Sequence, residues 1–271
     1  MRLSIRHTTR YSYTRPVVHA LLRLRLTPKH TQGQSIASWT MDYENASEEL
    51  VYDDQHFNTV ALVSVAPDAR EVVISCAGIV DTEDHAGVIG RHSGHMPLWS
   101  FLTQTPLTRP GTAMRGLLRD IDRQGRDKLE QLHSLSSLIL DRVDYSVGAT
   151  HVGTTGEEAI EAGSGVCQDH AHIFIGAARM LDIPARYVSG YLMMNDRIEQ
   201  NATHAWAEAY LEGLGWVGFD VANGISPDAR YVRVATGRDY RDAAPIGGIS
   251  FGTANAGLHV DVSVEQQPVQ Q

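Results

Sequence analysis

Residues 163 to 179 read Gly-Ser-Gly-Val-Cys-Gln-Asp-His-Ala-His-Ile-Phe-Ile-Gly-Ala-Ala-Arg, and this stretch decides the fold. Its first glycines permit backbone conformations closed to other residues, and the apolar residues after Cys167 recur at helical spacing. The pattern predicts a glycine loop that leads into a helix, with Cys167 in the first turn. Unpaired backbone N–H groups and the helix dipole stabilise a thiolate there. Cys167 is therefore a candidate nucleophile, and the alternative is a small core residue at a helix start.

The bulk composition limits the classes of protein and partner. The chain of 271 residues is 42% hydrophobic and 20% charged, which is globular composition for one large domain or two ordinary ones. With 23 basic and 32 acidic residues the formal net charge is −9, and without a basic cluster nucleic acid is not an expected partner. The sequence shows neither a signal-peptide pattern nor a run of about 20 apolar residues. We expect a cytoplasmic protein, no membrane partner, and free thiols at Cys76 and Cys167.

The patterning predicts an α+β fold built from two modules. Residues 1–85 alternate like strands between regularly spaced turn residues, which is typical of an antiparallel β-sandwich. Residues 86–112 are rich in Gly and Pro and predict a linker. Residues 113–264 form the expected catalytic core, and residues 265–271 are expected to fray.

Helices and an antiparallel sheet are expected within the core. The helical pattern over 113–143 predicts two helices broken near Gly125, and residues 157–162 predict a short one. The helix that begins near Cys167 should end before Pro184, because proline disfavours helix in the residue before it. The expected strands cover residues 185–192, 203–211, 216–221 and 257–264.

The hairpin over residues 203–221 carries the candidate partners of Cys167. Period two places His204, Trp206, Glu208 and Tyr210 on one face, opposite small alanines, and a face of this kind favours a site over an ordinary core. A tight turn over residues 212–215 would pair residues whose numbers sum to about 427. His204 should then lie near Asp220 to Asn223.

An imidazole beside a carboxylate is what a cysteine nucleophile requires. The imidazole takes the proton of the thiol and later protonates the leaving amine, while the carboxylate orients the ring and stabilises the imidazolium. Taken singly, His204 could be a satisfied interior histidine and Asp220 a turn residue. Together they predict a Cys167–His204–Asp220 triad.

Five stretches of the sequence resemble the bacterial transglutaminase-like cysteine protease family in order and spacing. They are Gly163 to His172, Asp182 to Tyr191, His204 to Trp206, Gly215 to Asp220 and Gly237 to Tyr240, and the strand-rich N-terminal region is similar to the family's N-terminal domain. The resemblance implies a papain-like α+β core with helices packed on an antiparallel sheet. It also implies Cys167 as nucleophile, His204 as base, Asp220 as orienter, and acyl transfer through a thioester. The family often has proline after the aspartate, where this sequence has Val221-Ala222-Asn223.

Further residues are expected around the site. Gln168 and Asp169 should hydrogen-bond the surrounding loops, Trp206 should wall the substrate channel, and Arg186 and Tyr191 should pack beneath it. The backbone N–H of Cys167 is a candidate oxyanion donor.

A metal site is the alternative for the histidines. Cys167, Asp169, His170 and His172 could be imagined around zinc, but successive helical positions point about 100° apart and cannot converge on one ion. The histidines at 85, 92 and 95 lack the spacing of a compact ligand set. We therefore expect neither a metal nor a cofactor.

The expected activity is cysteine-dependent acyl transfer or hydrolysis of a carboxamide, either a peptide bond or a glutamine side chain, in a protein or peptide substrate. Two alternatives stay open. One is a non-catalytic interaction module that retains the fold, and the other is an amidase for small peptides or cell-wall stems.

Overall fold

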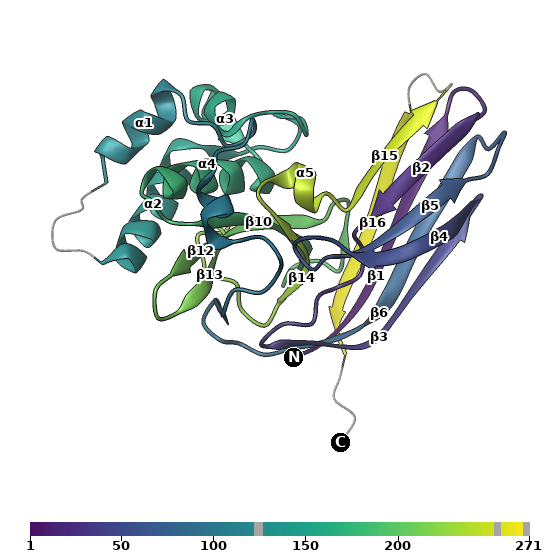
Figure 1. Ribbon diagram of the computed structural model, residues 1–271, viewed down its shortest axis with the longest axis horizontal. Coiled ribbons are helices and arrows are strands. Elements are labelled where there is room, and N and C mark those ends of the chain that lie inside the picture. Colours follow the sequence, from purple (N-terminus) through teal and green to yellow (C-terminus); the bar gives the residue numbers. More distant parts are fainter. Residues whose placement is uncertain (122–126, 252–255, 268–271) are drawn as a thin grey trace.

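The computed structural model describes residues 1–121, 127–251 and 256–267. The described chain forms layers: helices cover one face of a central sheet, and a β-sandwich packs against the other face (Figure 1). The strands are β1 (Arg2–Tyr13), β2 (His19–Leu24), β3 (Gln34–Glu44), β4 (Ala46–Asp53), β5 (Thr59–Val65), β6 (Glu71–Thr82), β7 (Val88–Gly90), β8 (Asp144–Tyr145), β9 (Ser164–Gly165), β10 (Ala185–Leu192), β11 (Glu199–Gln200), β12 (His204–Leu211), β13 (Gly215–Phe219), β14 (Tyr231–Gly237), β15 (Ile246–Phe251) and β16 (Ala256–Gln266). The helices are α1 (Thr112–Arg119), α2 (Lys128–Arg142), α3 (Gly156–Ala162), α4 (Cys167–Met180), α5 (Tyr240–Ala243) and the 3-10 helix Leu98–Leu102.

The sandwich consists of two antiparallel sheets, with the orders β11-β16-β1-β6-β3 and β15-β2-β5-β4. Alternation decides this arrangement, because every second residue of β1 from Leu3 to Thr9 and of β2 from Ala20 to Leu24 is buried between the sheets or against the central sheet. Leu3 and Ile5 of β1 pack against Val232 and Val234 of β14 and so join the sandwich to the central sheet. The expected N-terminal antiparallel β module and the α+β class are confirmed.

The C-terminal strands lie in a different place from the one the sequence suggests. Residues 257–264 were expected within the catalytic core, but β16 pairs with β1 from Leu3↔Gln266 to Tyr13↔Ala256, and β15 pairs with β2. Residues 265 and 266 continue β16 instead of fraying, and residues 268–271 lie outside the described residues. The free edge of β1 needs a hydrogen-bonding partner, and local pattern does not say which distant segment supplies it.

The expected linker over residues 86–112 also contains regular structure. Its strand β7 pairs with β13 and forms the edge of the central sheet, whose order is β14-β10-β12-β13-β7. The 3-10 helix follows, and its Phe101 ring contacts Trp216 of β13 edge-on at 5.2 Å between centroids. The segment is therefore packed against the core sheet.

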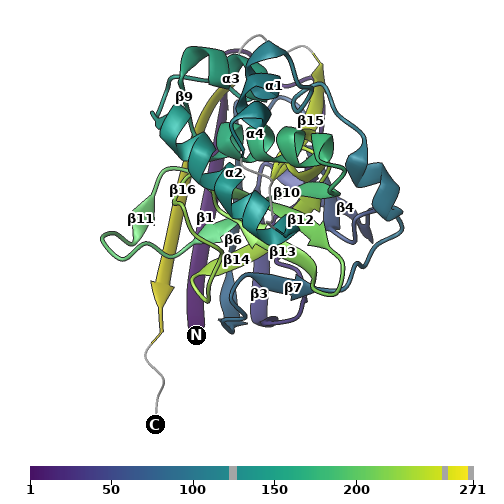
Figure 2. The same cartoon turned by 90° about the vertical axis from the view of Figure 1, so that its left-hand side faces the viewer.

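The helices cover the face of the central sheet that turns away from the sandwich (Figure 2). α4 packs most closely on β12, where Ala205, Ala207 and Ala209 leave room for its buried face. The helix itself begins at Cys167, as predicted, and ends at Met180, four residues before Pro184. α1 and α2 match the two predicted helices, although the expected break near Gly125 lies outside the described residues. Along the described ranges the longest helix has 15 residues, and none is apolar and long enough to cross a membrane.

Candidate active site

The glycine loop and the start of α4 fix the position of Cys167. Gly163 has a φ of +66°, which ends α3 in a left-handed turn, and a Cβ at Gly165 would lie 2.8 Å from the Asp169 side chain. Asp169 is fully buried and accepts hydrogen bonds from the Val166 N–H (2.8 Å) and the Thr150 hydroxyl (2.6 Å). The carboxylate therefore ties the loop and a second segment to the first turn of α4. Cys167 remains partly exposed at this helix start.

The hairpin presents His204 and Asp220 on the same face. β12 and β13 pair antiparallel with residue numbers that sum to 426, one less than expected, because β13 begins at Gly215 with a φ of +82°. An even sum places even-numbered residues of both strands on one face, so this register is the one that brings Asp220 to the side of His204. The His204 Nε2 atom lies 2.6 Å from Asp220 Oδ2. The predicted pairing is confirmed, with a shift of one residue.

Asp220 is held by more than the histidine. Its carboxylate is fully buried and also accepts hydrogen bonds from the Tyr231 hydroxyl (2.7 Å) and the Asn223 side-chain amide (2.7 Å). Burial alone would raise the pKa of Asp220, but the hydrogen bond and charge of His204, with those from Asn223 and Tyr231, lower it overall. Asp220 is therefore a fixed carboxylate at neutral pH.

His204 lies between the carboxylate and the thiol. Burial lowers its pKa, but hydrogen bonds to Asp220 and Cys167 and the negative charges of both outweigh burial and raise the pKa from 6.5 to about 10. The Nε2 atom faces Asp220, and Cys167 interacts with the same ring. The imidazole is consequently protonated at neutral pH, the form that stabilises a neighbouring thiolate.

A cavity of about 450 Å³ opens over Cys167 and His204. Its described lining includes Gln168, Tyr187 of β10 and Arg197. Gln168 also donates a hydrogen bond to the Val152 carbonyl at 3.3 Å, a contact with a neighbouring loop of the kind expected for it. Burial, and then the charge of Cys167, raise the pKa of Tyr187 well above its usual range, so its phenol stays protonated. The remaining described lining residues are Tyr145, Val147, Val166, Ser189, Met194, Gln200, Asn201, Ala202, Thr203, Ala205, Tyr240 and Pro245.

Two expected supporting residues lie elsewhere. Trp206 is buried behind the site, where its ring stacks on His204 with centroids 6.2 Å apart, and it is not among the described residues that line the cavity over Cys167. Tyr191 is buried where the central sheet meets the sandwich, and its hydroxyl lies 2.9 Å from His7 Nδ1. The expected wall and the expected support beneath the pocket are thus packing positions, because both faces of β10 and β12 are covered.

The histidines that follow Cys167 point in different directions. Both ring nitrogens of His170 lie 2.9 Å from backbone carbonyls, those of Val166 and Val143, whereas His172 accepts a hydrogen bond from the Tyr240 N–H at 3.2 Å. Burial lowers the pKa of His172 to about 3. These side chains brace the helix against its neighbours and do not converge.

Two residues of the site, Tyr231 and Asn223, were not predicted from the sequence patterns. Tyr231 begins β14, which is separated from β12 by β10 in the sheet order, so spacing along the chain gave no signal for it. Asn223 could have been found, because an amide three residues after the carboxylate can fold back on it.

The fold and the cysteine at a helix start define an α+β protein of papain-like architecture. Residues 115–221, which contain Cys167, His204 and Asp220, match the transglutaminase-like superfamily, and residues 3–81 match the bacterial transglutaminase-like N-terminal region. The chain thus carries a transglutaminase-like core preceded by the bacterial transglutaminase-like N-terminal region.

Similar proteins extend over nearly the whole chain. A candidate cysteine protease from Cytophaga hutchinsonii shares the fold with a TM-score of 0.78 at 22% identity, over 100% of this chain and 92% of that one. An uncharacterized protein of Mycobacterium leprae is 26% identical over 97% of this chain and 98% of its own length. An uncharacterized protein of Mycobacterium tuberculosis is 28% identical over 98% and 93%. The structural likeness shows that the fold is shared over the whole chain.

Proposed function

We propose that Cys167, His204 and Asp220 form a triad that transfers or hydrolyses the acyl group of a carboxamide in a peptide or protein. The observation that supports this most directly is that His204, bonded to Asp220 at 2.6 Å, lines the same open cavity as Cys167. The alternative function, a protein-interaction module without catalysis, would not require a protonated imidazole beside a thiol.

The reaction runs in two halves. The Cys167 thiolate attacks the carboxamide carbon, and the His204 imidazolium gives its proton to the departing nitrogen, which leaves as an amine or as ammonia while the thioester forms. Water or an amine then attacks the thioester carbon and gives a proton to His204, which restores the thiolate and the imidazolium. Asp220 stays ionised throughout and keeps the ring oriented.

Oxyanion stabilisation calls for donors near the carbonyl oxygen. The backbone N–H of Cys167 is one, because the first N–H groups of a helix lack partners inside the helix. The Tyr187 hydroxyl is the proposed second donor, because it lines the same cavity and stays protonated.

Product analysis tests the proposal. The protein is incubated with a peptide library, with and without a primary amine, beside the Cys167→Ala variant, and products are identified by mass spectrometry. Cleaved bonds would show a protease, ammonia lost from glutamine a deamidase, and amine adducts a transglutaminase. An absence of Cys167-dependent product in every condition would contradict the assignment.

Thiol alkylation tests the state of the nucleophile without a substrate. Iodoacetamide should label Cys167 at least about 100-fold faster than Cys76 at neutral pH, because Cys76 is buried and its pKa is raised to about 12. The His204→Ala variant should slow labelling of Cys167 and leave Cys76 unchanged. Equal rates at the two thiols would remove the support for an activated cysteine.

A further inference from the structure

A second cavity, of about 460 Å³, lies on the sandwich side of the central sheet. Its described lining comes from the loop after β2, strand β3, the turn between β4 and β5 with its flanking residues, the segment Ile89–Ser93, and strands β10 and β14. None of these described lining residues borders the cavity over Cys167. The two cavities are therefore separate sites.

Two buried guanidinium groups line this second cavity and share a single carboxylate. The side chains of Arg186 and Arg233 are 7% and 6% exposed, and Glu208 between them is completely buried. Arg186 Nε donates to Glu208 at 2.7 Å, and Arg233 donates through Nε at 2.6 Å and Nη2 at 3.0 Å. Two cations against one anion leave a net positive charge at the cavity.

The outer nitrogens of these guanidinium groups are available to a ligand. Within the part of the chain that the structure describes, Nη1 and Nη2 of Arg186 and Nη1 of Arg233 have no hydrogen-bond partner, and none of these atoms is fully buried. The guanidinium of Arg186 lies over the Trp216 ring, with its Cζ 3.8 Å from the ring centroid. A guanidinium fixed by Glu208 and Trp216 presents its donors at little entropic cost.

The other ionisable side chains around the cavity are mostly basic. Lys29 donates to the His56 carbonyl (2.9 Å) and to the Asn58 side chain (2.9 Å), and its pKa falls to about 7 because of burial and the charges of Arg233 and Arg186. Arg91 and His30 are exposed lining residues, and Asp53 is the single acidic residue in the described lining. The whole chain has a net charge of −9, so this local excess is opposite in sign to the protein's own charge.

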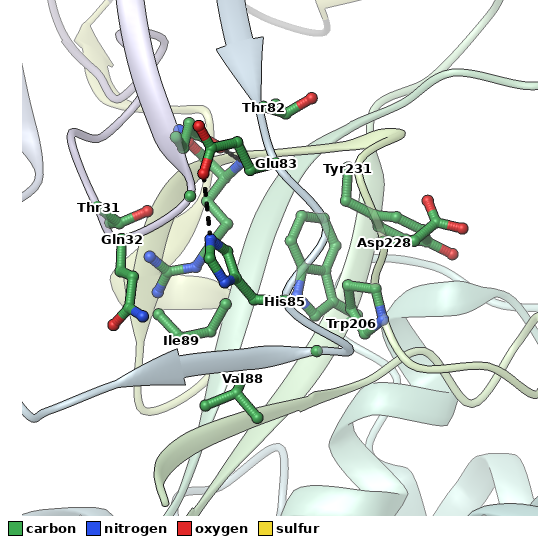
Figure 3. A pocket seen from close by; sticks show the side chains of 15 residues that line it. Thr31, Gln32, Thr82, Glu83, His85, Val88, Ile89, Trp206, Asp228 and Tyr231 are labelled. Carbon is green, nitrogen blue, oxygen red and sulfur yellow. Dashed lines mark hydrogen bonds and ion pairs between the residues drawn. The ribbon is translucent and has the colours of Figure 1, made fainter. Parts of the chain in front are cut away.

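A smaller hollow of about 40 Å³ adjoins the cavity (Figure 3). Thr31, Gln32, Ile89 and Arg233 line both spaces. In Figure 3, Gln32 and Ile89 lie on one side of His85, and Trp206 and Tyr231 lie on the other. The smaller hollow is thus lined by Trp206 and Tyr231, which contact His204 and Asp220 from behind the triad.

We propose that this cavity binds a small organic anion, a carboxylate or a phosphate ester, with Arg186 and Arg233 at its base and Arg91 at its rim. Planar guanidinium donors match both oxyanions, and the volume lies within the roughly 300–1,000 Å³ range of small-molecule sites. The assignment does not depend on the chemistry of Cys167.

Binding is tested by calorimetric titration of the full chain at constant ionic strength. The probes are citrate for the carboxylate class, glycerol 3-phosphate for the phosphate class, and glycerol as the neutral control. Saturable binding of one anion with unit stoichiometry is expected, and the class that binds more tightly identifies the ligand chemistry. Failure of both anions to bind the folded wild-type protein would overturn the proposal.

Charge-matched variants locate the site. Arg91→Glu should weaken binding about tenfold or more, because it reverses a charge at the rim. Arg115→Glu makes the same change in net charge on the exposed face of α1 and should bind as the wild type does. Arg186→Lys keeps the charge beside Glu208 but removes the planar guanidinium and its paired N–H donors. It should weaken anion binding even if the midpoint of unfolding does not change. Equal affinity in all three variants would place the anion elsewhere and refute the assignment.

Discussion

Two buried carboxylates lie on the same face of the hairpin β12–β13 and differ in their partners. Asp220 is bonded to His204, Tyr231 and Asn223, whereas Glu208 is bonded to two guanidinium groups. Both are completely buried, and charged or hydrogen-bonding partners lower the pKa of both against the effect of burial.

The two sites differ in whether the partner of the carboxylate can release a proton. An imidazole can release its proton within the range of a reaction, and His204 reaches the cavity over Cys167. Arginine stays charged: burial lowers the pKa of Arg186 only to about 10, and Glu208 limits that fall. One carboxylate can therefore support proton transfer, while the other fixes two cations permanently.

The largest expected effect follows from Asp220→Asn. The variant should lower kcat about 10⁴-fold, because an amide no longer stabilises the imidazolium or selects the ring's tautomer. Steady-state kinetics on a substrate from the library measures the loss. Asp228→Asn, which changes a half-exposed carboxylate paired with Arg230, is the matched control and should stay within about twofold. A loss of less than tenfold in Asp220→Asn would exclude the proposed orienting role.

Glu208→Gln should act on stability instead. Removing the carboxylate leaves Arg186 and Arg233 buried without a counterion, so the free energy of unfolding should fall by about 3–5 kcal/mol. Urea unfolding measures the change, with Glu212→Gln in the exposed hairpin turn as the control. A change in the free energy of unfolding below about 1 kcal/mol would contradict a stabilising role for Glu208.

Tyr231→Phe should have a smaller effect on catalysis. It removes the hydroxyl that donates to Asp220 at 2.7 Å but leaves His204 and Asn223 bonded to the carboxylate. We expect kcat/KM to fall about tenfold, the cost of one hydrogen bond to a charged group. Tyr210→Phe, on the same sheet but away from Asp220, should have no effect on kcat/KM. A loss as large as that of Asp220→Asn would mean that Tyr231 contacts the substrate directly.

The smallest expected effect is a dependence of stability on pH. The pKa of His204 is about 10 when folded and 6.5 when unfolded, so its protonation stabilises the fold fully below pH 6.5 and is lost as the pH rises toward about 10. Unfolding in urea between pH 6 and 10 should show wild type losing about 1–2 kcal/mol more than Asp220→Asn, which lacks the partner that holds the proton. Parallel curves would contradict the raised pKa.

Local signals in the sequence were enough for the nucleophile's helix and the hairpin. The glycine loop, the helical spacing after Cys167 and Pro184 together bounded α4 closely. The alternation of His204, Trp206 and Glu208 with alanines correctly separated the two faces of β12, although only His204 of these three lines the cavity over Cys167. These features depend on residues that are close together in the sequence, so a local sequence pattern is enough to predict them.

Features that depend on distant contacts were missed. Tyr191 lies in β10, which is buried on both faces, so alternation could not say that it meets the sandwich instead of the site. Tyr231 of β14 bonds to Asp220 although β10 and β12 lie between β14 and β13 in the sheet. The proposed anion cavity is likewise lined by residues far apart in the sequence, from the loop after β2 to β14. Such contacts depend on tertiary packing and produce no periodic pattern in the sequence.

The pairing of β16 with β1 has a consequence for synthesis at the ribosome. β1 leaves the ribosome long before β16 and gains its second neighbour only when residues 256–266 emerge, although β6 can pair with it much earlier. Until then the growing chain carries an open strand edge that can accept the wrong partner. The cysteine helix and the hairpin are thus synthesised before the sandwich sheet that contains β1 is complete, and pairing of β16 with β1 is a late step in folding.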